Sequence, residues 1–186
     1  MKKIVFMIFL SICINGFAQS SCGILWEDLS INEKKIISKD STLSSLELEY
    51  KEGISVPCWK LLNNLEYLTM DTCQATLPIR YYYFCRILND ADGDVSEIIG
   101  KYCCKMIFLN PKCLLTYLAS NSKLLSRFAY YIGYELYFVD EGCSNLDIDY
   151  KTFEETLRVQ IKEQILINAL NRLLYEIKNT MSNMDD

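Results

Sequence analysis

The chain of 186 residues contains no histidine. This absence excludes Ser-His and Cys-His nucleophilic pairs, HExxH zinc proteases and the most common general base at neutral pH. Hydrolases that rely on two carboxylates, such as glycosidases, remain compatible with the composition. The acidic pairs that could serve such chemistry are Glu27-Asp28, Asp140-Glu141, Asp147 with Asp149, and Glu154-Glu155. Each lies where a helix is expected to begin or a loop to turn, so we predict structural roles for them and no catalytic residue.

Clusters of basic residues are also missing. Lysine and arginine total 19 against 24 aspartates and glutamates, and no run of lysines is longer than two. Binding to nucleic acid depends on clustered lysine and arginine side chains that contact phosphates, so the sequence predicts no nucleic-acid partner. The excess of acidic residues favours a protein partner with a basic surface.

Proline and glycine are scarce, with three prolines and seven glycines in the whole chain. No linker rich in these residues divides the sequence, which predicts a single domain. The apolar run from Ile4 to Ile14 is shorter than the roughly 20 residues that a transmembrane helix needs. We therefore expect no transmembrane anchor.

The N-terminus has the pattern of a signal peptide. Lys2-Lys3 forms a short positive start, the apolar run follows, and Gly16-Phe17-Ala18 places small residues at the two positions that a signal peptidase reads. We predict cleavage after residues 1–18 and a periplasmic or secreted protein. The alternative is a lipoprotein with a lipid anchor on Cys22, although Gln19-Ser20-Ser21 lacks the usual aliphatic residue before such a cysteine.

Cleavage would leave 168 of the 186 residues, enough for one domain with a sizeable core. Because Lys2 and Lys3 are lost, 17 basic residues then face 24 acidic ones, which gives a net charge of −7. The exported form is thus more acidic than the full chain.

Nine cysteines are present, and Cys13 lies in the predicted signal peptide. The remaining even number, in an exported domain, predicts roughly two to four disulfides, with buried free thiols as the alternative. Cys103 and Cys104 would project about 100° apart on a helix, so they should bond to different partners. No C-x-x-C spacing or histidine supports a metal site, and no cofactor is predicted. The disulfide candidates are Cys22, Cys58, Cys73, Cys85, Cys103, Cys104, Cys113 and Cys143.

Apolar residues recur at helical spacing along most of the chain. Asp94-x-x-Glu97 resembles a capping box and begins one amphipathic segment. Asn110-Pro111 ends that segment and begins the next, and Ser122 is expected to cap a longer helix that reaches about Val139. Its inward side chains are predicted to be Leu124, Leu125, Phe128, Ile132 and Leu136.

Three further helices are predicted, at 55–70, 79–88 and 150–179. In the last, the apolar stripe expected to face inward includes Phe153, Leu157, Ile161 and Ile165. The Tyr-rich run from Tyr81 to Phe84 is also compatible with a strand. At about 1.5 Å per residue, the last segment would extend roughly 45 Å, so we expect it to break or to project beyond a compact domain.

Together these elements predict an all-α fold. It would be a single domain of roughly five to seven helices, arranged as an antiparallel bundle or a short α-solenoid of helix pairs and stapled by disulfides. Residues 19–54 show no clear pattern. Residues 55–181 would form the helical domain, and residues 182–186 a disordered tail.

Two local patterns suggest specific sites. Tyr130, Tyr134 and Tyr137 share one helix face, either packed against 150–179 or available to a protein partner, including a second copy of the chain in a homodimer. The acids from Asp90 to Asp94 resemble the start of a calcium loop. The glycine and glutamate that such a loop requires are absent further on, so we predict a turn and no calcium site.

Three functional hypotheses follow. The first is an exported, non-catalytic protein that binds another protein, such as an inhibitor or immunity protein that blocks a toxic periplasmic enzyme. The second is a glycan hydrolase that uses two carboxylates, which must face each other across a cleft. The third is a structural or scaffold protein of the cell envelope. The lack of histidine and of catalytic motifs favours the first.

Overall fold

The computed structural model describes residues 26–53, 56–70, 77–91, 93–140 and 148–184. Within these ranges the fold is all-helical, as predicted, with no strand. The elements are η1 (Trp26–Asp28), α2 (Ile31–Ile37), α3 (Ser41–Glu52), α4 (Cys58–Thr69), α5 (Leu77–Asp90), α6 (Gly93–Leu109), α7 (Pro111–Ser120), α8 (Ser122–Asp140), α9 (Tyr150–Gln160) and α10 (Gln164–Ser182). The predicted signal peptide and Cys22 lie outside the described residues.

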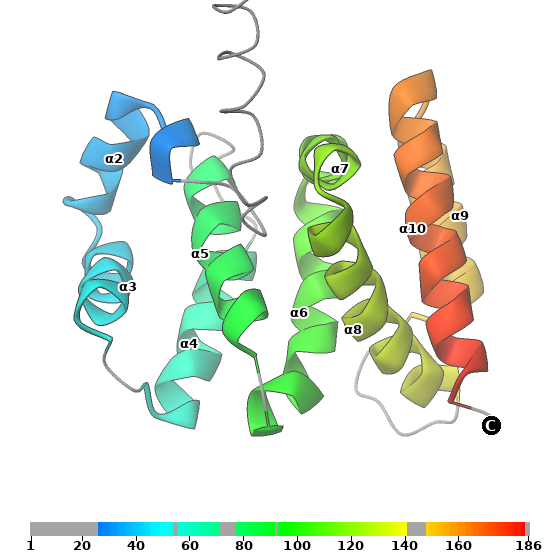
Figure 1. The fold of residues 1–186 in the computed structure, drawn as a ribbon, viewed down its shortest axis with the longest axis horizontal. Coiled ribbons are helices and arrows are strands. Elements are labelled where there is room, and N and C mark those ends of the chain that lie inside the picture. Colours follow the sequence, from blue (N-terminus) through cyan, green and yellow to red (C-terminus); the bar gives the residue numbers. More distant parts are fainter. Residues whose placement is uncertain (1–25, 54–55, 71–76, 92, 141–147, 185–186) are drawn as a thin grey trace, which may run out of the picture.

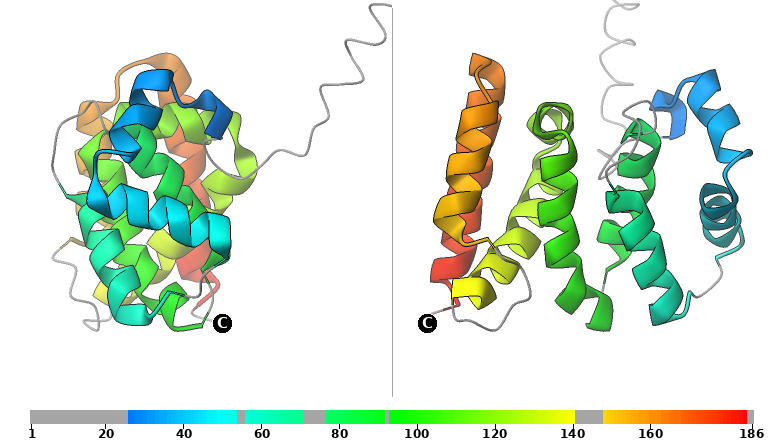
Figure 2. Two further views of the ribbon diagram at one scale, coloured as in Figure 1. Left: turned by 90° about the vertical axis from the view of Figure 1, so that its left-hand side faces the viewer. Right: turned by 180° about the vertical axis from the view of Figure 1, so that it is seen from behind.

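The helices follow one another across the molecule in chain order, from α2 and α3 at one end to α9 and α10 at the other (Figures 1 and 2). The helix α8 packs between α6 and α10, and α4 packs against both α5 and α6. No helix in the described part of the chain has both the length and the apolar character needed to cross a membrane.

The described residues form nine α-helices, more than the five to seven predicted, partly because residues 31–52 fold into α2 and α3. Ser30 and Glu33 form a capping box at the start of α2, and Asp40 accepts hydrogen bonds from the first backbone N–H groups of α3. These two helices bury few apolar side chains, so their periodicity in the sequence is weak. The capping residues are the stronger signal.

The Tyr-rich run belongs to α5 and is helical, not a strand. This helix is buried on nearly all sides, as expected for a helix enclosed by its neighbours. Its buried tyrosines satisfy their hydroxyl groups by hydrogen bonds: Tyr81 donates to the Asn110 carbonyl (3.2 Å) and Tyr83 to the Glu47 carboxylate (2.9 Å). The run shows no strand alternation because the core surrounds α5 on nearly all sides.

The predicted helix at 150–179 breaks into α9 and α10 between Ile161 and Glu163. Ile161 is buried at the turn, and both halves bury apolar side chains, which a single projecting helix could not do. The turn also changes the register, so Ile165, predicted to face inward, is exposed. The predicted cap of α8 was wrong by one residue: Asn121, not Ser122, accepts a hydrogen bond from the Leu124 backbone N–H (3.0 Å).

The predicted disulfides are not found among the described residues. Cys85, Cys103, Cys104 and Cys113 are thiols that no disulfide joins. The first three are buried in the helical core as small apolar side chains, and Cys113 is half-buried against it. Cys22, Cys73 and Cys143, and the side chain of Cys58, lie outside the described part.

Buried thiols predict a distinct reactivity. Cys103 and Cys104 are fully buried and burial raises the pKa of both, so iodoacetamide should modify them only after unfolding. Half-buried Cys113 is the internal control and should react first in the native protein. Peptide mass spectrometry after alkylation with and without guanidinium chloride measures this. Equal native labelling of all three, or a disulfide at Cys103 or Cys104, would contradict the described core.

Candidate binding pocket

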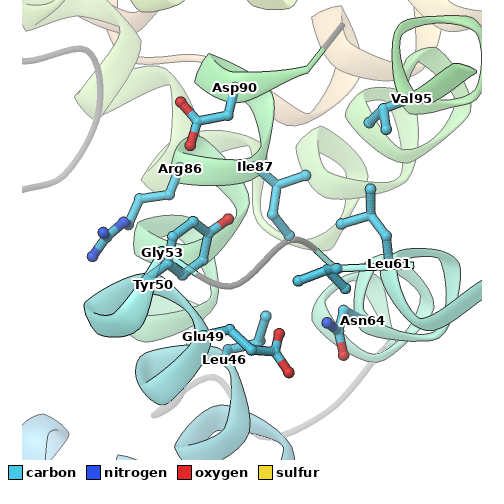
Figure 3. A pocket seen from close by; sticks show the side chains of 11 residues that line it. Leu46, Glu49, Tyr50, Gly53, Leu61, Asn64, Arg86, Ile87, Asp90 and Val95 are labelled. Carbon is cyan, nitrogen blue, oxygen red and sulfur yellow. The ribbon is translucent and has the colours of Figure 1, made fainter. Parts of the chain in front are cut away.

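A pocket of about 490 Å³ lies between α3, α4 and α5 (Figure 3). Gly53 caps the C-terminus of α3 in a left-handed backbone conformation (φ 62°). In this conformation its N–H donates to the Glu49 carbonyl. Such a volume is typical of small-ligand sites. The lining residues are Leu46, Glu49, Tyr50, Gly53, Val56, Leu61, Asn64, Arg86, Ile87, Asp90 and Val95.

Glu49 is the buried acid of the pocket, with 6% of its surface exposed. Its Oε1 accepts hydrogen bonds from the Ser45 hydroxyl (2.9 Å) and from the Lys60 ammonium. Lys60 also donates to Ser45 (3.3 Å), so the three side chains form a connected polar group. The other oxygen, Oε2, accepts no hydrogen bond from the described residues.

Asn64 contributes a second buried polar group from α4. It is 6% exposed, and its Nδ2 donates no hydrogen bond to the described residues. Figure 3 shows the Glu49 carboxylate and the Asn64 amide at the same end of the pocket, one from α3 and one from α4. Because each atom lacks a hydrogen-bond partner, the two do not bond to each other. Two side chains that line the pocket therefore hold one acceptor and one donor that are buried from solvent and that the described protein leaves unsatisfied.

Arg86, Tyr50 and Asp90 form the other part of the lining. The Arg86 guanidinium stacks over the Tyr50 ring at 4.1 Å and donates to the Tyr82 hydroxyl (2.6 Å). Burial, with a further contribution from the Asp90 carboxylate, raises the pKa of Tyr50, so its hydroxyl stays protonated and able to donate. The exposed Asp90 and the half-exposed Arg86 place opposite charges at this end.

The residues predicted to bind a partner lie elsewhere, on α8. Tyr130 is exposed, while Tyr134 and Tyr137 are half-buried and pack edge-on against Phe138, with ring centroids 4.8 and 5.6 Å apart. The three tyrosines thus share one helix but differ in exposure. Partner binding through this helix face stays a prediction.

The acidic pairs singled out in the sequence are not gathered at the pocket. Asp149 caps α9 by accepting from the Thr152 N–H (2.7 Å), and this bond lowers its pKa. Glu154 pairs with Arg158 (2.7 Å), and Glu27 is exposed. Asp149 thus caps a helix and Glu154 forms an ion pair within α9. Glu141 and Asp147, with the side chains of Asp28 and Asp140, lie outside the described residues.

Sequence reasoning missed Glu49 and Asn64, although a signal for both exists. Glu49 follows Leu46 by three positions on α3, and Asn64 follows Leu61 by three on α4. Each polar residue therefore falls on the apolar stripe of its helix, where an unpartnered polar side chain is costly. Polar residues on an apolar helix face are the pattern that identifies this pocket.

Other surface grooves lack this feature. The groove that contains Trp26, Lys34 and Lys51 is larger, about 760 Å³, but no buried, unsatisfied polar atom lines it among the described residues. No cluster of three histidine, cysteine, aspartate or glutamate side chains in the described ranges could hold a metal ion. The α3–α4–α5 pocket is thus the strongest candidate site.

Comparison with known proteins adds no assignment. The chain matches no protein-family model, no curated protein and no solved structure.

Proposed function

We propose that this chain is an exported, non-catalytic binding protein, and that the α3–α4–α5 pocket receives part of a protein partner. The observation that carries the proposal is that two side chains lining the pocket, Glu49 and Asn64, each hold a buried atom, Oε2 and Nδ2, without a hydrogen-bond partner. Each unsatisfied buried group costs about 1–3 kcal/mol. A protein that retains two of them in one pocket is expected to use them on a ligand.

Binding is favoured over catalysis for two reasons. The chain has no histidine, and one oxygen of the buried carboxylate is already held by Lys60 and Ser45. A general acid or base must exchange a proton with its substrate, and a carboxylate fixed in this way is better suited to accept one more hydrogen bond.

The nature of the partner follows from charge and surface. The exported form would carry a net charge of −7, which attracts a basic protein surface and speeds association. The helices that line the pocket also carry large exposed apolar side chains, Leu48 on α3 (53% exposed) and Trp59 on α4 (65%). Tryptophan is enriched where proteins bind each other. An inhibitor or immunity protein that blocks a toxic periplasmic enzyme fits this description, in a row of helices that we interpret as a short α-solenoid.

The proposal predicts a partner whose capture depends on the pocket. Asn64→Leu removes the buried donor and fills the space, so it should lower partner capture at least tenfold. The exposed neighbour Asn63→Leu is the matched control and should capture as the wild type does. The measurement is quantitative pull-down from a periplasmic extract at physiological salt. If no protein is captured more strongly by the wild type and by Asn63→Leu than by Asn64→Leu, the proposal is wrong.

A glycan hydrolase is the second candidate, because one specific feature favours it. Glu49 and Asp90 both line the pocket, so two carboxylates share one cavity. Glu49→Gln and Asp90→Asn would each abolish glycan cleavage if this were the activity, while Glu97→Gln, on the exposed surface of α6, would not. If the wild-type protein does not digest cell-wall glycans, this candidate is excluded.

A further inference from the structure

The two unsatisfied groups at the buried end of the pocket have opposite hydrogen-bonding character. Glu49 Oε2 can only accept from a ligand, and Asn64 Nδ2 can only donate. A ligand group that satisfies both must offer both a donor and an acceptor, as a carboxamide or a hydroxyl does. Carboxylates and phosphates offer no donor, and ammonium groups offer no acceptor, so none of these satisfies both.

The charges around this end of the pocket further limit which ligand groups can bind. The Lys60 ammonium already compensates the Glu49 carboxylate, and Asn64 is neutral, so the buried end carries no net charge. A ligand cation or anion placed there would be buried without a counter-charge, which is costly. An uncharged group is not penalised in this way. The pocket therefore favours a neutral group of mixed donor and acceptor character.

We propose that the buried end binds a carboxamide: the Glu49 and Asn64 side chains, whose unsatisfied atoms are buried from solvent, turn towards the ligand, so that its N–H donates to Glu49 Oε2 and its carbonyl accepts from Asn64 Nδ2. On the proposed function, on which this inference rests, the carboxamide is the side chain of an asparagine or glutamine of the partner protein. A side chain of this size fits easily within 490 Å³. Leu46, Leu61 and Ile87 supply an apolar wall, and hydrogen bonds are stronger in such surroundings than in water.

The same arrangement explains selectivity. A site that hydrogen-bonds a polar group rejects analogues that lack it, because its own buried groups are then left unsatisfied. Leucine or methionine in place of the partner's asparagine or glutamine would contact the apolar wall. It would leave Glu49 Oε2 and Asn64 Nδ2 without hydrogen bonds. A partner side chain without an amide should therefore bind weakly.

The test uses the ¹⁵N-labelled protein, purified as its cells process it, and four small probes. These are propionamide, the similarly sized propionate and propylammonium ions, and N-acetylglucosamine. Nuclear magnetic resonance reads the Asn64 side-chain amide and the Gly53 backbone amide, both of which line the pocket. We expect propionamide to shift both signals, with a Kd on the order of tens of millimolar, and the two ions to shift neither. Asn64→Asp should abolish the Gly53 shift, while the exposed control Asn63→Asp should preserve it.

The other outcomes overturn the inference in distinguishable ways. Stronger shifts with propylammonium would make the pocket a cation site. Stronger shifts with N-acetylglucosamine than with propionamide would assign the amide to a sugar, not to a partner side chain. No shift with any probe, while partner capture still depends on Asn64, would reject the carboxamide and leave the proposed function standing. Propionamide binding without any captured protein would reject the protein partner alone.

Discussion

Replacing Lys60, which is 36% exposed, by methionine is expected to lower the free energy of unfolding by about 2 kcal/mol, the cost of leaving a buried charged group without its partner. Glu49 is 6% exposed and pairs with the Lys60 ammonium, so the substitution would leave a buried carboxylate without its counter-charge. Methionine keeps most of the volume of the lysine stem, which limits the loss of packing. Urea denaturation measures the change.

Two variants separate this effect from a general loss of a lysine. Lys51 pairs with Glu47 on the same helix at 3.1 Å but is 66% exposed, so Lys51→Met should cost under about 0.5 kcal/mol. The double variant Lys60→Met, Glu49→Met removes both charges and should recover most of the stability, because apolar replacements of a buried pair are often neutral. Equal losses for Lys60→Met and Lys51→Met would show that Glu49 does not depend on its partner.

Gly100→Leu is expected to lower the free energy of unfolding by about 3 kcal/mol, at the upper end of the usual cost of overpacking. A Cβ at this position of α6 would lie 2.6 Å from the Tyr131 carbonyl oxygen and 2.8 Å from Glu135 Cβ, both on α8. A backbone carbonyl cannot move aside as a flexible side chain can, so α6 and α8 would have to separate. Thermal unfolding should shift by about 2–4 °C for each kcal/mol lost.

The matched control is Glu97→Leu, one turn earlier on α6 at an exposed position, where the same side chain meets no neighbouring helix. It should change stability by no more than about 0.5 kcal/mol. Gly133 provides an independent check, because a Cβ there would lie 2.9 Å from the Ile177 carbonyl oxygen on α10. If Gly100→Leu and Glu97→Leu unfold at the same temperature, α6 and α8 are not in such close contact.

Much of the helical pattern was readable from the sequence. The apolar stripe of α8 predicted its buried side chains correctly, including Leu124, Phe128 and Ile132, because α8 has core on one side along its whole length. On α10, the predicted stripe was wrong at Ile165, which is exposed. The chain reverses just before it at a turn that contains no proline or glycine. Strong periodicity is thus reliable within a helix, and less so across an unmarked break.

The predicted disulfides illustrate a different limit. An even number of cysteines is compatible with pairing or with buried thiols, and only the packing of α5, α6 and α7 places Cys85, Cys103, Cys104 and Cys113 as thiols. Cysteine count and spacing carry no information on which side chains face each other. The prediction therefore depended on the expected compartment and not on geometry.

The helical class, the acidic charge and the lack of histidine chemistry could all be derived from the amino-acid sequence, because composition and short-range periodicity need no knowledge of how the chain packs. That Glu49 and Asn64 line one cavity, that Lys60 pairs with the acid, and that Gly100 meets a backbone carbonyl became visible only once the helices were packed. These facts join separate helices, and which polar side chains meet is decided by how the helices pack. No local pattern records that choice.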